Sequence, residues 1–191
     1  MWWPDKALKI SLLGRLAVVC VLGGLCAGCF QPLYGSTSDI NGSSVKDKLA
    51  GVDVRPIDAP NGTAVSRMGG EVRNELIFDF TGGSGKVTPG LATHALIINM
   101  AATAQQVIVD TTTARPDALN YGIDATYSLT DLKTNQIVLR GRAFSRVTYD
   151  IPGQEQRFAG LRAQRDAQDR ASKVLSEQIK QRLASYFLAG T

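Results

Sequence analysis

The hydrophobic positions of the chain follow two helical patterns. From Ala64 to Phe80 the apolar residues recur at spacings of three and four, which predicts an amphipathic helix. A second pattern predicts a long helix from about Gln156 to Phe187, with an apolar stripe formed by Ala167, Ala171, Val174, Leu175, Ile179, Leu183, Tyr186 and Phe187. Gly82-Gly83 ends the first helix. Gly69-Gly70 inside it marks either a close packing site or a weak point, because glycine disfavours a helix interior.

Alternation of apolar and polar side chains predicts four strands. The first is short, within Ala50 to Ile57, and the second is long, from Leu91 to Thr112. A change of parity near Ala101 to Ala104 predicts a bulge in the second strand. The third and fourth strands cover residues 121–130 and residues 137–149, with a turn between them.

The last strand has one apolar and one basic face. Its odd positions, from Ile137 to Tyr149, are mostly apolar, whereas its even positions include Arg140, Arg142 and Arg146. This pattern is typical of an antiparallel sheet that is covered on one side. The order strand, helix, three strands, helix predicts an α+β fold, with two helices packed on one face of a four-stranded, mostly antiparallel sheet.

The first 28 residues form a separate segment. A basic region up to Arg15 precedes an apolar run of ten residues, Leu16–Leu25, which is far shorter than the roughly 20 residues of a membrane-spanning helix. The small residues Ala27 and Gly28 follow, and then Cys29. This order of basic, apolar and small residues predicts an export signal peptide over residues 1–28.

The end of this segment resembles the lipobox of bacterial lipoproteins. In that family a signal peptidase cleaves before a cysteine that already carries diacylglycerol, and the freed amine then usually receives a fatty acid such as palmitate. The match departs from the family at Cys26, where Leu is usual. Cys29 is the best acceptor, because Leu25 and Val19 stand where Cys26 and Cys20 would need a small residue. The alternatives are an ordinary signal peptide and a short uncleaved anchor.

Cleavage before Cys29 leaves 163 residues, enough for one domain with its own core. Residues 29–46 are rich in small polar residues and predict a lipidated tether, and residues 47–191 predict a single α+β domain. The mature chain, residues 29–191, has 18 basic and 16 acidic residues, and this near balance does not favour nucleic acid as a partner. No cysteine follows Cys29, so the domain depends on core packing without a disulfide.

The sequence carries no enzyme signature. The only histidine, His94, lacks a cysteine or a suitable base to complete a triad, and we interpret it as an ordinary surface or edge residue. No His, Cys and Asp cluster has zinc spacing, so neither a metal nor another cofactor is expected. The segment Gly82–Lys86 lacks the full phosphate-loop pattern and follows a helix, which favours a helix-ending loop.

The basic stripe of Arg140, Arg142 and Arg146 is the most informative polar feature, and it has two interpretations. It is either a solvated strand face, paired in part with Asp124 across the hairpin, or a cationic surface for phosphate or carboxylate groups. A guanidinium binds such groups through two parallel hydrogen bonds.

Three stretches resemble the LptE family of lipopolysaccharide (LPS)-assembly lipoproteins in its alphaproteobacterial form. Cys29–Gly35 is similar to the family's opening after the cysteine, although the usual Gly following that cysteine is missing. Arg67–Leu76 is similar to the family's first helix. Ser145–Asp150, Phe158-Ala159 and Asp166–Ala184 are similar to the family's C-terminal pattern. Together with the lipobox, these motifs span nearly all of the mature chain.

The resemblance implies a non-enzymatic role. Such proteins plug the lumen of the outer-membrane barrel LptD, help it assemble and support LPS insertion into the outer leaflet. For this chain it implies Cys29 as the lipid anchor on the periplasmic side of the outer membrane, with an LptD-type barrel and LPS as partners. The stripe of Arg140, Arg142 and Arg146 is a candidate contact by its charge, since the family motifs contain no LPS-binding position. An auxiliary lipoprotein of an envelope ABC transporter is the alternative.

Overall fold

The computed structural model describes residues 44–83, 90–110, 115–151 and 157–189. All of them belong to one unit of the chain, Ser36–Thr191. The predicted signal peptide (residues 1–28), the lipidated Cys29 and most of the predicted tether lie outside the described residues.

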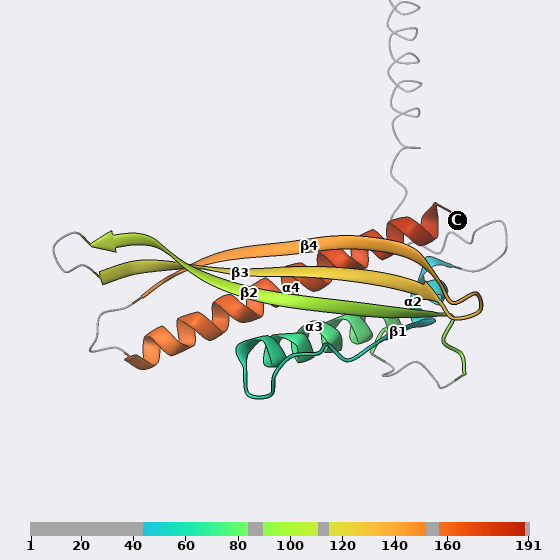
Figure 1. Ribbon diagram of the computed structural model, residues 1–191, viewed down its shortest axis with the longest axis horizontal. Coiled ribbons are helices and arrows are strands. Elements are labelled where there is room, and N and C mark those ends of the chain that lie inside the picture. The colour runs from blue at the N-terminus through green and yellow to red at the C-terminus, as the bar shows by residue number, and fades with distance from the viewer. Residues whose placement is uncertain (1–43, 84–89, 111–114, 152–156, 190–191) are drawn as a thin grey trace, which may run out of the picture. The chain divides into compact units, whose positions relative to one another are not determined.

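Within these ranges the sheet has four strands in the order β1–β2–β3–β4 (Figure 1). They are β1 (Val52–Val54), β2 (His94–Asp110), β3 (Arg115–Asp131) and β4 (Gln136–Asp150). β1 pairs parallel with β2, and the other two pairs are antiparallel. The alternation predicted for the third strand is confirmed, because its odd positions from Tyr121 to Leu129 are all buried.

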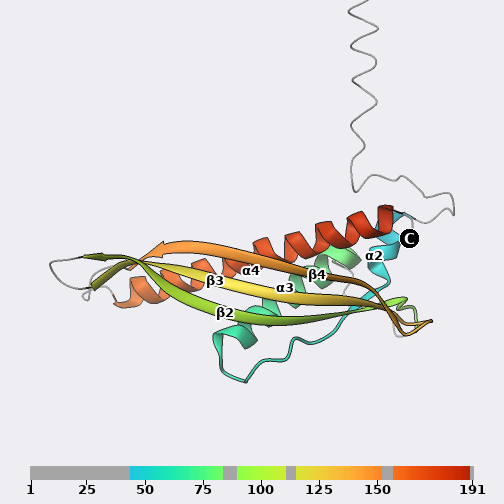
Figure 2. The same cartoon turned by 45° about the horizontal axis from the view of Figure 1, so that its top comes forward.

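Two long helices, α3 (Ala64–Thr81) and α4 (Arg157–Leu188), pack on the same face of this sheet (Figures 1 and 2). Thr63 caps α3, since its hydroxyl accepts a hydrogen bond from the Ser66 N–H at 3.2 Å. Gly82 ends α3 in a left-handed conformation (φ 63°), which glycine adopts without a steric penalty. The predicted α+β fold, with two helices on one face of a mostly antiparallel sheet, is confirmed.

A short helix, α2 (Val45–Ala50), precedes β1 and was not predicted. Its capping box joins Ser44 and Asp47, with the Asp47 N–H donating to Ser44 Oγ at 3.2 Å and the Ser44 N–H donating to Asp47 Oδ2 at 3.1 Å. Val45 and Leu49, one turn apart, are buried. Lys48 Nζ donates to the carbonyl of Phe187 at 3.2 Å, which connects α2 to the C-terminal turn of α4.

The core lies between the sheet and helices α3 and α4. Burying a side chain of Leu, Ile, Met or Phe contributes about 1.5–3 kcal/mol, so these layers supply the main stabilisation of the domain. Its largest fully buried members are Phe80, Met68, Leu76, Leu96, Ile98, Ile123, Leu129, Leu175, Ile179 and Leu183.

Two residues assigned to the apolar faces are exposed, and both assignments were wrong. Ile137 is 46% exposed, because the register between β3 and β4 shifts after Leu129 and moves the preceding β4 residues to the other parity. Val174 is 43% exposed. The buried stripe of α4 follows a spacing of four through Leu175 and Ile179, and Val174 lies on its flank.

The predicted bulge near Ala101 to Ala104 was also wrong in position. The pairing of β2 with β3 is regular from His94 to Gln106, and the register shifts only around Ile108. The change in hydrophobic parity has another cause. Beyond Met100 the positions on the covered side become progressively exposed, so that by residue 104 the strand faces solvent on both sides.

Candidate functional site

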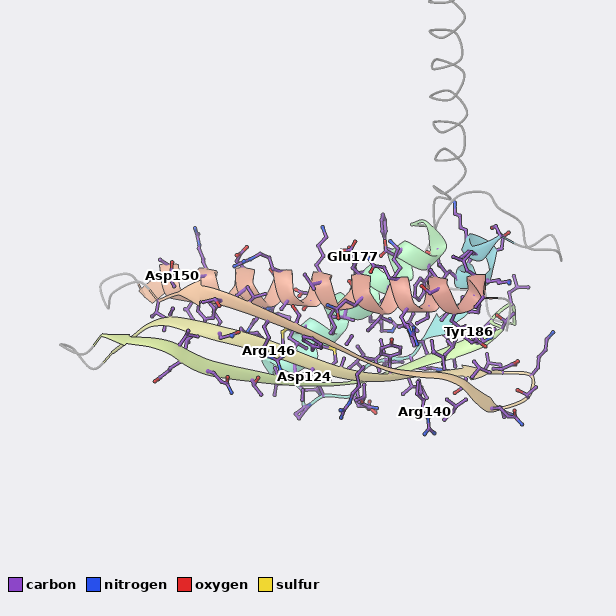
Figure 3. All side chains as sticks on the ribbon, turned by 90° about the horizontal axis from the view of Figure 1, so that it is seen from above. Asp124, Arg140, Arg146, Asp150, Glu177 and Tyr186 are labelled. Carbon is purple, nitrogen blue, oxygen red and sulfur yellow. The ribbon has the colours of Figure 1, made fainter. Side chains whose placement is uncertain are left out.

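The face of the sheet opposite α3 and α4 remains open. Figure 3 shows Arg140, Arg146 and Asp124 on this side, away from α4. Arg140, Arg142 and Arg146 are all exposed, whereas the β4 residues Ala143, Ser145 and Tyr149 between and beyond them are buried. The prediction of one apolar and one basic face for this strand is therefore confirmed.

Arg146 is held by hydrogen bonds to β3 and to its own strand, β4. Its Nη2 donates to both carboxylate oxygens of Asp124, at 2.8 and 3.1 Å, and its Nη1 donates to the carbonyls of Ile123 and Ser145 at 3.2 and 3.1 Å. Gly122 makes room for this side chain, because a Cβ there would lie 2.9 Å from Arg146 Cδ. The charge of Arg146 is thus neutralised by Asp124 as the solvated-face interpretation expected.

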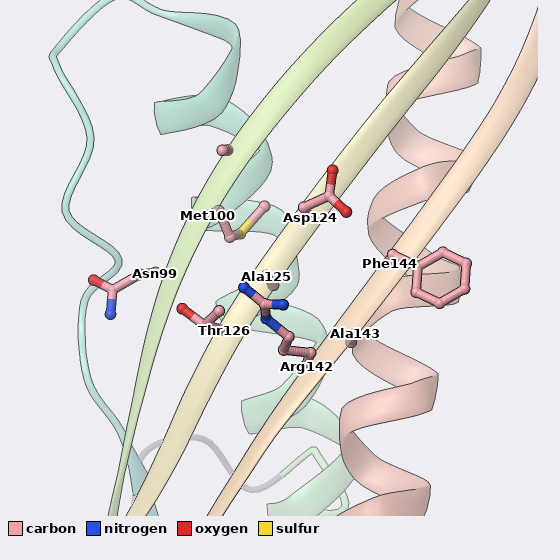
Figure 4. Close-up of a pocket in the computed structure, with 9 residues that line it drawn as sticks. Asn99, Met100, Asp124, Ala125, Thr126, Arg142, Ala143 and Phe144 are labelled. Carbon is pink, nitrogen blue, oxygen red and sulfur yellow. The ribbon is translucent and has the colours of Figure 1, made fainter.

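Arg140 and Arg142 have a different environment. They lie opposite Ser128 and Thr126 in the register with β3, and no acidic side chain among the described residues forms an ion pair with either. Figure 4 shows Arg142 extending from β4 over β3. The cationic-surface interpretation therefore stays a hypothesis for these two arginines, whereas Arg146 is paired with Asp124 across the hairpin.

Two shallow hollows lie beside Arg142. One has a volume of about 460 Å³ and the other about 700 Å³, and both are lined by Asn99, Thr126 and Arg142. Arg140 and Ser128 line the larger one. The larger hollow is thus a basin bordered by neutral donors and by two guanidinium groups. Such a basin suits a carboxylate or phosphate group, since each guanidinium has five N–H donors in a planar fork.

His94 is the first residue of β2 and packs against the end of α4. Its ring meets that of Phe187 edge-on, with centroids 5.2 Å apart, and its Nδ1 lies 2.9 Å from Thr93 Oγ1. Burial lowers the pKa of His94, and the Asp131 carboxylate opposes part of that shift. These contacts make the imidazole a half-buried packing group at the end of the sheet, where the sequence predicted an ordinary surface or edge residue.

An ion-pair cluster between α3 and α4 was not anticipated from the sequence. Arg67 Nη1 donates to Glu71 at 2.6 Å and to Asp169 at 2.9 Å, and Arg67 Nη2 donates to Gln168. The hydrogen bond that Arg67 donates to Asp169 raises the pKa of Arg67, while burial raises the pKa of Glu71 against the opposing charge of Arg67. Only the four-residue spacing of Arg67 and Glu71 is visible in the sequence. The cluster fastens α3 to α4.

The described part of the chain contains no group of three or more His, Cys, Asp or Glu side chains placed to hold a metal ion. No helix in the same ranges is both long and apolar enough to cross a membrane. Gly82-Gly83 ends α3 as predicted, and the rest of the Gly82–Lys86 segment lies outside the described residues.

Three solved structures match this chain, and the first of them is similar in fold. A crystal structure of a Caulobacter crescentus CB15 protein described as a lipoprotein matches with a TM-score of 0.57 and 21% identity, over 77% of this chain and 97% of that chain. A minor lipoprotein from Acinetobacter baumannii gives a TM-score of 0.43 and 12% identity, over 71% and 90% of the two chains. The hypothetical protein CT253 from Chlamydia trachomatis gives 0.44 and 10%, over 72% and 97%.

No curated protein sequence matches the chain. A family model does match, over residues 49–183, which include almost all of the described sheet and helices. That family is LptE, described as lipopolysaccharide-assembly, and the match covers well over half of the sequence. The match agrees with the resemblance of the helix and C-terminal motifs. This chain therefore belongs to the LptE family of lipopolysaccharide-assembly proteins.

Proposed function

We propose that this protein is an outer-membrane lipoprotein that plugs an LptD-type barrel, helps it assemble and supports LPS insertion into the outer leaflet. Membership in the lipopolysaccharide-assembly family gives the general role, which is non-enzymatic. The observation that carries the finer proposal is the open basic face of the sheet, where Arg140 and Arg142 have no acidic partner among the described residues.

The proposed anchor is Cys29, with acyl chains that hold the domain at the periplasmic side of the outer membrane. Each buried methylene contributes about 0.8 kcal/mol, and two or more chains are needed for stable attachment. In Cys29→Ser no diacylglyceryl cysteine can form, so residues 1–28 should not be cleaved off and labelling of the protein with radioactive palmitate should be lost. Unchanged palmitate labelling of Cys29→Ser would contradict lipidation at Cys29.

The proposed barrel contact is the open face. Arg140 and Arg142 would bind acidic groups of the barrel lumen or phosphate groups of LPS, because guanidinium favours both. Arg146 contributes less, since Asp124 already neutralises it.

The test is co-purification from solubilised outer membranes. The double variant Arg140→Ala/Arg142→Ala should recover less barrel protein or less LPS than the parent protein, whereas Arg55→Ala, beyond the opposite edge of the sheet, should recover the same amounts. Unchanged recovery of both barrel and LPS would leave the arginines as a solvated face only. Recovery of an ATPase complex in place of a barrel would favour the ABC-transporter alternative.

A further inference from the structure

The outer edge of β4 is an unpaired strand edge. β4 is the last strand of the sheet, and its register with β3 is continuous from Leu139 to Asp150. The Phe144 N–H donates to Gln178 Oε1 on α4 at 3.3 Å, so it points away from β3. Because backbone groups alternate along a strand, the N–H and C=O groups of Arg140, Arg142 and Arg146 point outward as well.

These outward groups can pair with another polypeptide. In the described part of the chain no further strand lies beside β4. A row of unpaired N–H and C=O groups is a template for an added strand, in which main-chain hydrogen bonds supply affinity and side chains supply specificity. The single bond from Phe144 to Gln178 occupies one of these donors and leaves the neighbouring ones at Arg142 and Arg146 available.

The charge on β4 disfavours pairing with a second copy of the same edge. In an antiparallel pair centred on Gly141, Arg140 of one copy would lie opposite Arg142 of the other, and neither has an acidic partner among the described residues. Like charges directly opposite each other destabilise a sheet. The same charges favour a strand that places acidic side chains beside Arg140 and Arg142, which lack an acidic partner among the described residues.

The other flank of the edge is formed by α4, which presents one exposed apolar side chain beside the polar Gln178. Val174 is 43% exposed and lies four residues before Gln178, on the same side of α4. Phe144 is 63% exposed and does not belong to this flank, because it shares the open face with Arg142 and lines the same hollow (Figure 4). A strand added here would therefore have α4, with Val174, next to its second face. Its alternate residues should be apolar.

We propose that the outer edge of β4 binds an extended segment of a partner protein in which acidic and apolar residues alternate. The acidic residues lie beside Arg140 and Arg142, and the apolar residues face α4 near Val174. This inference goes beyond the proposed function and does not depend on it, because it follows from the strand edge and its charges.

The test uses the whole protein in a neutral detergent and a fluorescent peptide of about ten residues that alternates Val and Glu. Binding is followed by fluorescence anisotropy. Two control peptides carry the same charge, one N-methylated at every Glu and the other at every Val. N-methylation at Glu should weaken binding about tenfold if the strand adds antiparallel, and N-methylation at Val if it adds parallel, because each removes donors facing β4. If both methylated peptides bind as well as the parent, the contact is only electrostatic and the proposal is wrong.

Protein variants separate the backbone from the charge. Arg142→Ala should weaken binding several-fold, and Arg142→Pro should weaken it further, since proline also removes the outward N–H. Arg55→Ala, which removes one positive charge beyond the opposite edge of the sheet, should bind as the parent does. Circular dichroism and thermal unfolding verify that each variant is folded. No measurable binding of the parent peptide at low salt, or equal binding by folded Arg142→Pro and Arg142→Ala, would overturn the proposal.

Discussion

The paired glycines in α3 offer a test of packing at single-atom resolution. Gly69 is buried, and a Cβ placed on it would lie 3.2 Å from both Cβ and Cγ2 of Ile57. Gly70 is exposed, and a Cβ placed there would have no neighbour within 4 Å. The two positions have the same helical backbone but opposite surroundings. The sequence alone left open whether they were a packing site or a weak point.

The expected magnitudes follow from these distances. Alanine is favoured over glycine in a helix interior by about 0.5–1 kcal/mol, so Gly70→Ala should raise the free energy of unfolding by that amount. Gly69→Ala gains the same propensity but must displace Ile57 by a few tenths of an ångström, so the net change should be near zero. Gly69→Val adds two more carbons in this contact and should cost about 1–3 kcal/mol.

The measurement is urea unfolding of the detergent-solubilised protein, followed by circular dichroism. For a domain of this size, 1 kcal/mol corresponds to a shift of about 2–4 °C in Tm, which provides an independent check. The reasoning would be refuted if Gly69→Ala stabilised the protein as much as Gly70→Ala, because the contact with Ile57 would then impose no cost. Destabilisation by Gly70→Ala would refute the open surroundings of that position.

Three further predictions concern the same domain. Burial lowers the pKa of His94 below its ordinary value of 6.5, so the unfolded chain binds the proton more readily than the folded protein. The free energy of unfolding should therefore fall as pH drops below about 6.5. This part of the pH dependence should vanish in His94→Gln when unfolding is measured from pH 7.5 to 5. The ion pair Asp79–Lys180 is joined at 3.0 Å, and both side chains are less than a quarter exposed. In a double-mutant cycle it should give a larger coupling energy than the exposed pair Asp166–Arg170, for which about 0.5 kcal/mol or less is expected. Equal coupling energies would contradict the role of burial. Leu175→Ala should lower the free energy of unfolding by about 2–5 kcal/mol, whereas Val174→Ala should change it by less than about 0.5 kcal/mol. Similar decreases for the two variants would contradict the boundary between buried and exposed positions on α4.

The strength of each hydrophobic pattern decided which parts of the fold could be predicted. Helix α3 and strand β3 carry uninterrupted periodicity, so the sequence predicts α3 to within one residue and the covered face of β3 correctly. Helix α2 escaped prediction because it spans only six residues and its apolar face consists of Val45 and Leu49. Its start depends on the capping box at Ser44, which lies in a segment whose composition is typical of a tether.

Register shifts and pairings between distant elements were harder to predict. The shift beside Leu129 reverses the orientation of Ile137, and one extra residue in a strand leaves no mark in composition. Asp169 belongs to the polar side of α4 by its spacing, and its partner Arg67 is 102 positions away in the chain. Such a pairing depends on how α3 and α4 pack together, which periodicity within each helix does not determine.

The arginines of β4 show how this difference bears on function. Alternation placed Arg140, Arg142 and Arg146 on one face, and they lie there. Their charges are not equivalent, however, because Gly122 and Asp124 on the neighbouring strand provide room and a carboxylate for Arg146 only. The positive potential of the open face is therefore concentrated at Arg140 and Arg142, beside the unpaired edge. Substituting Asp124→Asn would release Arg146 from its ion pair. This substitution should strengthen binding of the acidic peptide if charge limits the affinity, and it should leave the affinity unchanged if backbone pairing limits it.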